Sequence, residues 1–322
     1  MNRPRPAAKR VSLLGIWLVR LLVGTAELFL RLFVLGRRLP KVARQLPDLA
    51  YGPSRRQRLD VVVPEGAGPF PVLVYVHGGA WVSGDKANFR WFSHALAANG
   101  VLIFSVNYRW APEARFLDLI ADVAQAVAFA RAHAREHGGD PDRLFLTGDS
   151  AGAHLVCWLH MAQAWPHLLA TVGTPAANLA PALKGSILLY GMFDVAKTWQ
   201  LGRSVHTPIR AILDGAAPSD RPDQTALVSP LRLVAPSVAP VMLCAGEIDP
   251  LCAQSQALAD SLDRDGVPHR TVLLDKDEFP DAGDSFIRFG ARKASQAALR
   301  EALAFIADPI GPVPAGKERT AT

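Results

Sequence analysis

The chain has little cysteine, and the few cysteines form no pattern. Cys157, Cys244 and Cys252 are not at the spacing of a metal site, and an odd number argues against a closed disulfide framework. The sequence therefore predicts no metal and no other cofactor, and it favours a reducing compartment on the cytoplasmic side. It also contains no internal repeat and no low-complexity region, and nothing in it specifies an oligomeric state.

Most of the chain lacks an excess of basic charge, although the formal net charge is +6. Residues 1–46 carry ten Lys and Arg against the single acid Glu27, a net charge of +9. The remaining 276 residues therefore sum to −3. A mildly acidic globular region has no basic stripe to neutralise phosphates, which excludes nucleic acid as the expected partner.

Residues 11–35 are strongly apolar but lack the run of about 18 uncharged residues that a plain membrane span requires. Arg20, Glu27 and Arg31 interrupt the run, and no small-residue cleavage site of a secretory signal follows it. On a helix, these three residues and Gly24 form one narrow polar stripe, with Glu27 placed to pair with Arg31. Its basic flanks favour peripheral association with an anionic membrane surface. Packing on the globular domain as part of a cap is the main alternative, and a true span the least favoured one.

The chain of 322 residues, half of them hydrophobic, is long enough to bury a large core, which excludes disordered and small disulfide-stapled classes. From residue 51 onward, apolar runs of strand length alternate with longer helical patterns. The expected strands are 58–64, 70–77, 101–108, 143–147, 184–190, 240–245 and 269–274, and the expected helices are 117–137, 151–164, 253–265 and 287–306. This alternation predicts an α/β fold with a doubly wound, mostly parallel sheet.

Three segments follow from this pattern. Residues 1–46 form an apolar and basic N-terminal helical segment, residues 47–307 form the α/β domain, and residues 308–322, rich in Pro and Gly, form a flexible tail. Residues 191–238 interrupt the alternation of strands and helices. We expect them to form an inserted cap region over the sheet.

The clearest chemical motif is Gly148-Asp149-Ser150-Ala151-Gly152, between an expected strand and an expected helix. It matches the G-x-S-x-G nucleophile elbow in the strand–turn–helix context that the motif requires. The glycines leave room for a sharp turn that lifts the Ser150 hydroxyl above the sheet, and the helix N-terminus favours a developing anion. Ser150 is therefore the candidate nucleophile.

A second motif, His77-Gly78-Gly79-Ala80-Trp81, follows the expected strand 70–77. Its glycines free the backbone, so that the N–H groups of Gly78, Gly79 and Ala80 can point at an oxyanion together with that of Ala151. We interpret His77 as a residue that shapes the loop and not as the catalytic base. We expect His154, four residues after Ser150 on the same helix, to be a satisfied interior residue.

These two motifs and the segment Gly246-Glu247-Ile248-Asp249-Pro250-Leu251 together resemble the α/β-hydrolase fold. The specific resemblance is to the hormone-sensitive-lipase-like carboxylesterases and to the kynurenine formamidase branch, over residues 50–306. The resemblance implies a serine nucleophile, matched by Ser150, and an acid after the penultimate strand, matched by Asp249. Glu247 is a weaker candidate for that acid.

The third residue that the resemblance implies, a histidine after the last strand, is absent. Where the family has a segment like Gly-His-x-Phe, this chain has Gly283-Asp284-Ser285-Phe286, and no histidine occurs after His269. An ordinary carboxylate, with a pKa near 4, is a poor base for a serine hydroxyl. If Asp284 lies beside Asp249, repulsion between the carboxylates makes one of them easier to protonate and so a better base.

The leading hypothesis is a serine carboxylic-ester or small-amide hydrolase that forms a covalent acyl-enzyme with a small apolar substrate. Ser150, Asp249 and Asp284 would form an altered catalytic relay, weakened by the loss of histidine. The alternative is a catalytically inactive ligand-binding protein on the same fold, because fold alone does not establish catalysis. A third interpretation is that Asp284 is a single substitution in an otherwise competent site.

Overall fold

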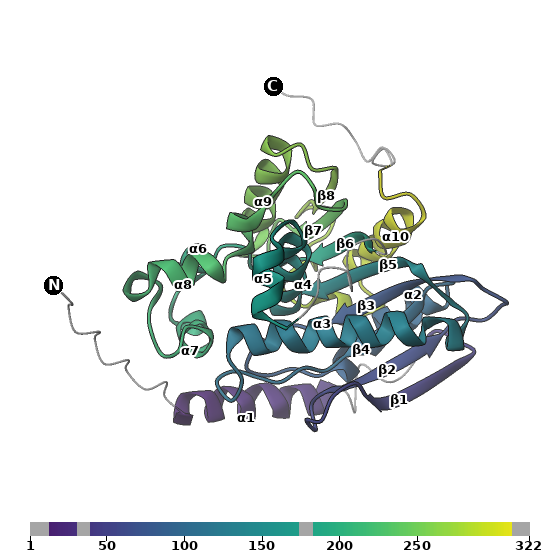
Figure 1. The fold of residues 1–322 in the computed structure, drawn as a ribbon, viewed down its shortest axis with the longest axis horizontal. Helices are drawn as coiled ribbons and strands as arrows, with labels where there is room; N and C mark the ends of the chain where they lie inside the picture. The colour runs from purple at the N-terminus through teal and green to yellow at the C-terminus, as the bar shows by residue number, and fades with distance from the viewer. Residues whose placement is uncertain (1–12, 31–38, 174–182, 311–322) are drawn as a thin grey trace.

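The computed structural model describes residues 13–30, 39–173 and 183–310, and its centre is one eight-stranded sheet. The strand order is β1-β2-β4-β3-β5-β6-β7-β8. The strands are β1 (Arg44–Ala50), β2 (Arg58–Val63), β3 (Phe70–Val76), β4 (Leu102–Val106), β5 (Gly139–Asp149), β6 (Leu183–Leu189), β7 (Val241–Gly246) and β8 (His269–Leu274). Strands β3 to β8 run parallel, whereas β1 and β2 pair antiparallel at one edge. The predicted doubly wound, mostly parallel sheet is confirmed (Figure 1).

Helices cover both faces of the sheet, which explains why its strands are continuous apolar runs. Val72, Val74 and Val76 of β3 belong to the same core cluster as buried residues of α3 (Phe116–His133), α4 (Ala151–Met161) and α9 (Cys252–Arg264). The alternate residues Leu73 and Tyr75 belong to a second cluster, with buried residues of α2 (Arg90–Ala97) and α10 (Lys293–Ala307). Because successive side chains of a strand point to opposite faces, β3 contributes to both halves of the core.

Two elements differ from the sequence-based expectation. Strand β1 was not expected; it lies at the sheet edge with four exposed positions out of seven, so it has no apolar run. The last helix begins at Lys293 and not at residue 287, because residues 286–288 form a short 3-10 turn and Gly290 follows. A Cβ at Gly290 would overlap the indole of Trp91, so the chain there is fixed by a tertiary contact.

The expected insertion lies between β6 and β7 and is helical. It contains α6 (Val195–Trp199), α7 (Arg203–Ile212) and α8 (Pro222–Leu227), joined by 3-10 turns and loops. These helices lie together at one side of the sheet (Figure 1). The short helix α5 (Pro166–Thr171) precedes β6.

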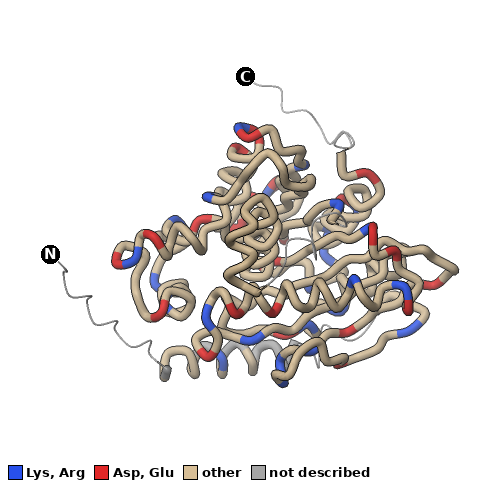
Figure 2. Tube along the Cα trace, viewed as in Figure 1, with Lys and Arg blue, Asp and Glu red and all other residues tan. Residues whose placement is uncertain are grey.

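The N-terminal segment contains helix α1 (Leu13–Leu30), as predicted. Arg20 faces the domain, whereas Leu14, Trp17, Leu18 and Leu21 are exposed. The predicted pairing of Glu27 with Arg31 and the tail beyond residue 310 lie outside the described residues. Among the described helices, none combines the length and the apolar character needed to cross a bilayer. Figure 2 shows charges of both signs interspersed over the sheet and its helices, without a basic face in this view.

Candidate active site

Ser150 lies at a sharp turn between β5 and α4. Its backbone is in a strained left-handed region, with φ 49° and ψ −119°. Both flanking glycines are required by close backbone approach: a Cβ at Gly148 would lie 2.5 Å from the carbonyl carbon of Gly152, and a Cβ at Gly152 would overlap the carbonyl groups of Val76 and His77. Ser150 is half-buried, whereas the residues on either side of it are fully buried. The turn therefore presents this side chain at the surface, with the geometry that the elbow motif predicts.

The loop after β3 is fastened against Ser150 by a buried carboxylate. Asp149 Oδ1 accepts hydrogen bonds from the Tyr75 hydroxyl (2.6 Å) and from the backbone N–H of Gly78 (2.8 Å). A Cβ at Gly78 would lie 2.5 Å from Asp149 Oδ2 and 3.1 Å from Ser150 Cβ. Only glycine lets the loop come this close to the candidate nucleophile.

The hydrogen bond to Asp149 changes the expected role of Gly78. Its single N–H is already donated, so the geometry favours Gly79, Ala80 and Ala151 as the donors of an oxyanion hole. The N–H groups of these three residues donate no hydrogen bond within the described part of the chain. Gly79 (φ 131°), Ala80 (φ 50°) and Trp81 (φ 63°) all have positive φ, an unusual run that turns the backbone sharply beside the elbow.

Two histidines of the sequence motifs hold this loop in place. Trp81 Nε1 donates to Nδ1 of His154 (3.0 Å), and His154 Nε2 donates to the carbonyl of Val228 (2.6 Å). His77 Nδ1 donates to the carbonyl of Gly78 (2.6 Å), and its ring stacks on Tyr108. Burial lowers the pKa of His77 to about 3 and that of His154 to about 4. Both rings are therefore neutral and structural.

Two of the predicted carboxylates lie close enough to interact. Asp249 follows β7 and is buried, and its Oδ1 accepts the backbone N–H of Leu251 (2.8 Å). Burial, together with the charge of the exposed Asp284 beyond β8, raises the pKa of Asp249 to about 6. Burial also raises the pKa of Asp149 to about 7, opposed mainly by the Tyr75 hydrogen bond. The charge of Asp284 contributes to the raised pKa of Asp249, which is the direction expected if the two carboxylates repel each other.

No imidazole reaches this site. All nine histidines lie within the described residues, and no imidazole ring among them has a hydrogen bond to Ser150 or Asp249. His269 begins β8, at the opposite end of that strand from the loop that carries Asp284.

Tyr190 was missed by the sequence analysis. It follows β6, between the strands that lead to Ser150 and Asp249, and its backbone has φ 39°. Its buried hydroxyl has no hydrogen-bond partner among the described residues, and it lies within electrostatic range of the carboxylates of Asp149, Asp284 and Asp249. Burial raises its pKa well above the usual value, so the hydroxyl stays protonated. Its place after a buried parallel strand was the only available signal, and that signal does not distinguish it from a core tyrosine.

Helix α1 is joined to the loop that carries the candidate oxyanion amides. Arg20 Nε donates to the carbonyl of Val82 (2.8 Å), and its Nη2 donates to the carbonyl of Ala111 (3.0 Å). Both terminal nitrogens of Arg20 also donate to the carboxylate of Glu113 at 2.6 Å. The guanidinium lies over the ring of Trp110, 5.0 Å from its centroid. Arg20 therefore fastens α1 to the domain.

Arg20→Ala should destabilise the fold, because it leaves two carbonyls and a carboxylate without their donor. We expect the free energy of unfolding to fall by about 1–3 kcal/mol, measured by urea unfolding. Arg55→Ala is the matched control, since Arg55 is exposed and has no hydrogen bond among the described residues. Equal stabilities of the two variants would contradict the contacts of Arg20.

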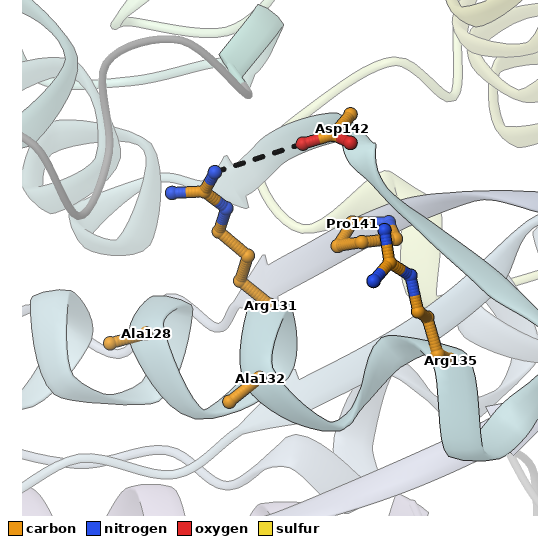
Figure 3. Close-up of a pocket in the computed structure, with 6 residues that line it drawn as sticks. All are labelled: Ala128, Arg131, Ala132, Arg135, Pro141 and Asp142. Atoms are coloured by element: carbon orange, nitrogen blue, oxygen red, sulfur yellow. Dashed lines mark ion pairs between the residues drawn. The ribbon is translucent and has the colours of Figure 1, made fainter.

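A separate pocket lies away from this site. It is lined by Ala128, Arg131, Ala132, Arg135, Pro141 and Asp142 (Figure 3). Arg131 Nη2 and Asp142 Oδ1 form an ion pair there, 3.7 Å apart. Asp142 is near the start of β5, whereas Ser150 follows its end, so the pocket and Ser150 lie at opposite ends of this strand. Within residues 13–30, 39–173 and 183–310, no group of three or more His, Cys, Asp or Glu residues could hold a metal ion.

Comparison with known families and curated proteins gives consistent matches. The family model described as BD-FAE matches residues 59–262. The isoprenylcysteine alpha-carbonyl methylesterase of Arabidopsis thaliana is 30% identical over 236 residues, which are 70% of this chain and 54% of that protein. Esterase LipQ of Mycobacterium tuberculosis is 28% identical over 226 residues, 69% of this chain and 53% of that protein. The chain therefore spans about half the length of these two relatives.

Two solved esterase structures have the same fold as this chain. Esterase B of Lactobacillus rhamnosis has a TM-score of 0.80 at 21% identity, with 92% of this chain and 94% of that chain covered. An esterase of Pyrobaculum calidifontis has a TM-score of 0.70 at 19% identity, with 97% of each chain covered. The predicted α/β-hydrolase fold is thereby confirmed. At these identities the likeness shows the fold, and the chemistry has to be argued from the site.

Proposed function

The chain belongs to the BD-FAE family, and from this membership and the site we propose that it is a serine ester hydrolase acting through a covalent acyl-enzyme. The observation that carries the proposal is the strained turn at Ser150, next to the backbone amides of Gly79 and Ala80, which donate no hydrogen bond to any described residue. Strain of this kind is retained where function needs it.

In the proposed reaction, Ser150 Oγ attacks the carbonyl carbon of the ester while its proton passes to a carboxylate. Gly79, Ala80 and Ala151 donate to the oxyanion that forms. Collapse of the tetrahedral intermediate breaks the bond to the alkoxy group, and the proton leaves with the alcohol. Water then attacks the acyl-enzyme in the same way and releases the carboxylic acid and free Ser150.

The carboxylates Asp249 and Asp284 form the proposed relay in place of an imidazole. A base works best when its pKa is near the working pH, and the pKa of Asp249 is raised to about 6 by burial and by Asp284. The raised pKa supports turnover with Asp249 as the general base. The turnover should be slow, because a carboxylate is a weaker base for a serine hydroxyl than the imidazole of histidine. The alternative, a ligand-binding protein that does not turn over, is not favoured, because the relatives that the chain matches are named as esterases.

The proposed substrates are small apolar carboxylic esters, with small amides as a second class. The two relatives are named as an esterase and as an isoprenylcysteine alpha-carbonyl methylesterase. A carboxylic ester is the substrate class that we propose for this chain. The exposed apolar residues of α1 support peripheral contact of the protein with a membrane surface. Cys157, Cys244 and Cys252 are free thiols, which supports a location on the cytoplasmic side of that membrane, where thiols stay reduced.

Ser150→Ala tests the proposal. The wild-type protein should be labelled by a fluorophosphonate and should hydrolyse a short-chain p-nitrophenyl ester, and the variant should lose both activities. Ser237→Ala, an exposed serine before β7, is the matched control and should behave as wild type. Equal rates for wild type and Ser150→Ala would remove the proposal. Retention of the ester without labelling or turnover would support the binding protein instead.

A further inference from the structure

Helix α1 carries an exposed apolar stripe, defined here as Leu14, Trp17, Leu18 and Leu21. Their exposed fractions are 71%, 69%, 51% and 55%. The spacing i, i+3, i+4 and i+7 places all four side chains on one face of the helix. These four residues are half of the large hydrophobic side chains that are exposed in the described part of the chain. Such clustering marks an interaction surface, whereas single exposed hydrophobic residues do not.

The opposite side of α1 is fastened, so the stripe cannot turn inward without breaking polar contacts. Arg20 holds the carbonyls of Val82 and Ala111 and the carboxylate of Glu113. Ile16 is 2% exposed and belongs to the hydrophobic core. The rotation of the helix about its axis is therefore set by the domain, with the stripe facing outward.

The charge of the flanking sequence indicates what covers the stripe. Lys9 and Arg10 precede it, and Arg37, Arg38 and Lys41 follow it within a segment that has one acidic residue. Basic residues on both sides of an apolar helical face match the plane of an anionic bilayer, in which headgroups flank acyl chains. No helix of the described part can span a bilayer, so α1 would lie along the surface.

We infer that the stripe Leu14, Trp17, Leu18 and Leu21 inserts into the interface of an anionic phospholipid bilayer. This inference names the helix face and the kind of lipid surface for the peripheral membrane contact of the proposed function, and it rests on that function. Arg20 then links the lipid-bound helix to the loop that carries Gly79 and Ala80, since Val82 lies two residues after Ala80. The domain is held with this loop next to the surface from which an apolar ester would enter.

The test uses vesicle flotation of the full chain carrying Ser150→Ala, so that binding is measured without turnover. This protein should float with vesicles of phosphatidylcholine and phosphatidylglycerol, and increasing salt should weaken the binding. The triple change Leu14→Ser, Trp17→Ser and Leu21→Ser should lower the affinity by at least about tenfold. Ile310→Ser is the matched control, because Ile310 is 75% exposed but lies at the other end of the described chain. Thermal melting of each variant reports folding.

Three results would overturn the inference. The first is that the protein with the unchanged stripe does not float with the phosphatidylglycerol vesicles. The second is that the triple variant floats as well as the Ile310→Ser control. The third is that the protein with the unchanged stripe binds vesicles of phosphatidylcholine alone as tightly as vesicles that contain phosphatidylglycerol. Stripe-dependent dimers that do not bind vesicles would identify a second copy as the true occupant. Because the assay needs no catalysis, vesicle binding by a protein without esterase activity would sustain this inference while the proposed function failed.

Discussion

Asp284→His should raise kcat/KM for a short-chain p-nitrophenyl ester by about 10²- to 10⁴-fold. The change places an imidazole where the resemblance to the hormone-sensitive-lipase-like carboxylesterases implies a histidine, between Gly283 and Phe286. Asp284 already lies close enough to affect the pKa of Asp249, so the new ring would have a carboxylate to orient it and to stabilise its charged form. Steady-state rates as a function of substrate concentration and pH measure the effect.

Two variants separate this effect from a general change in the pocket. Asp284→Asn removes the same negative charge without supplying a base, so its rate should not rise. In the double variant Ser150→Ala with Asp284→His, the gain should disappear, because the imidazole has no hydroxyl to activate. A folded Asp284→His protein with the rate of wild type would show that the pocket has diverged beyond this one position.

The pH dependence of the gain provides a second check. In wild type, the proposed base is a carboxylate whose pKa is about 6 for Asp249, so activity should increase as the pH rises through about 6. In Asp284→His, the repulsion from the Asp284 carboxylate is gone, and the pKa of Asp249 should fall. The profile should then follow the histidine, whose ordinary pKa is about 6.5.

The parts of the fold that could be predicted from the sequence are those set by local pattern. The buried parallel strands are continuous apolar runs, and the elbow is a short motif whose glycines have a local steric reason. The sequence also contains no histidine after His269, and the place of Asp284 between Gly283 and Phe286 stays a prediction that rests on the family resemblance.

The parts that could not be predicted depend on contacts between distant residues. The hydrogen bond from the Tyr75 hydroxyl to Asp149 joins residues 74 positions apart. The same Asp149 oxygen accepts the backbone N–H of Gly78, which is 71 positions from Asp149 in the sequence. The outward direction of the α1 stripe depends on Arg20 reaching residues more than 60 positions away. Helical periodicity identified the polar and apolar sides of α1 but not which of them faces the domain.

Asp149→Asn should flatten the pH dependence of stability. Burial raises the pKa of Asp149 from the usual 3.8 to about 7, so the folded protein binds a proton that the unfolded chain releases between these values. The stabilising contribution is complete below pH 3.8 and is lost as the pH rises through about 7. Tyr75, Arg288 and Asp284 face the same carboxyl, but all three remain in the variant.

Comparing the two proteins isolates the titration of this one group. Between about pH 5 and pH 8, the stability of Asp149→Asn relative to wild type should increase by roughly 2–3 kcal/mol, measured by urea unfolding at each pH. The Asn side-chain oxygen can still accept from the Tyr75 hydroxyl and the Gly78 N–H. Asp149→Ala removes that acceptor and should lose about 2–4 kcal/mol even at pH 5. Parallel curves for wild type and Asp149→Asn would show instead that Asp149 is ionised throughout, and its charge would then have to be balanced within the site.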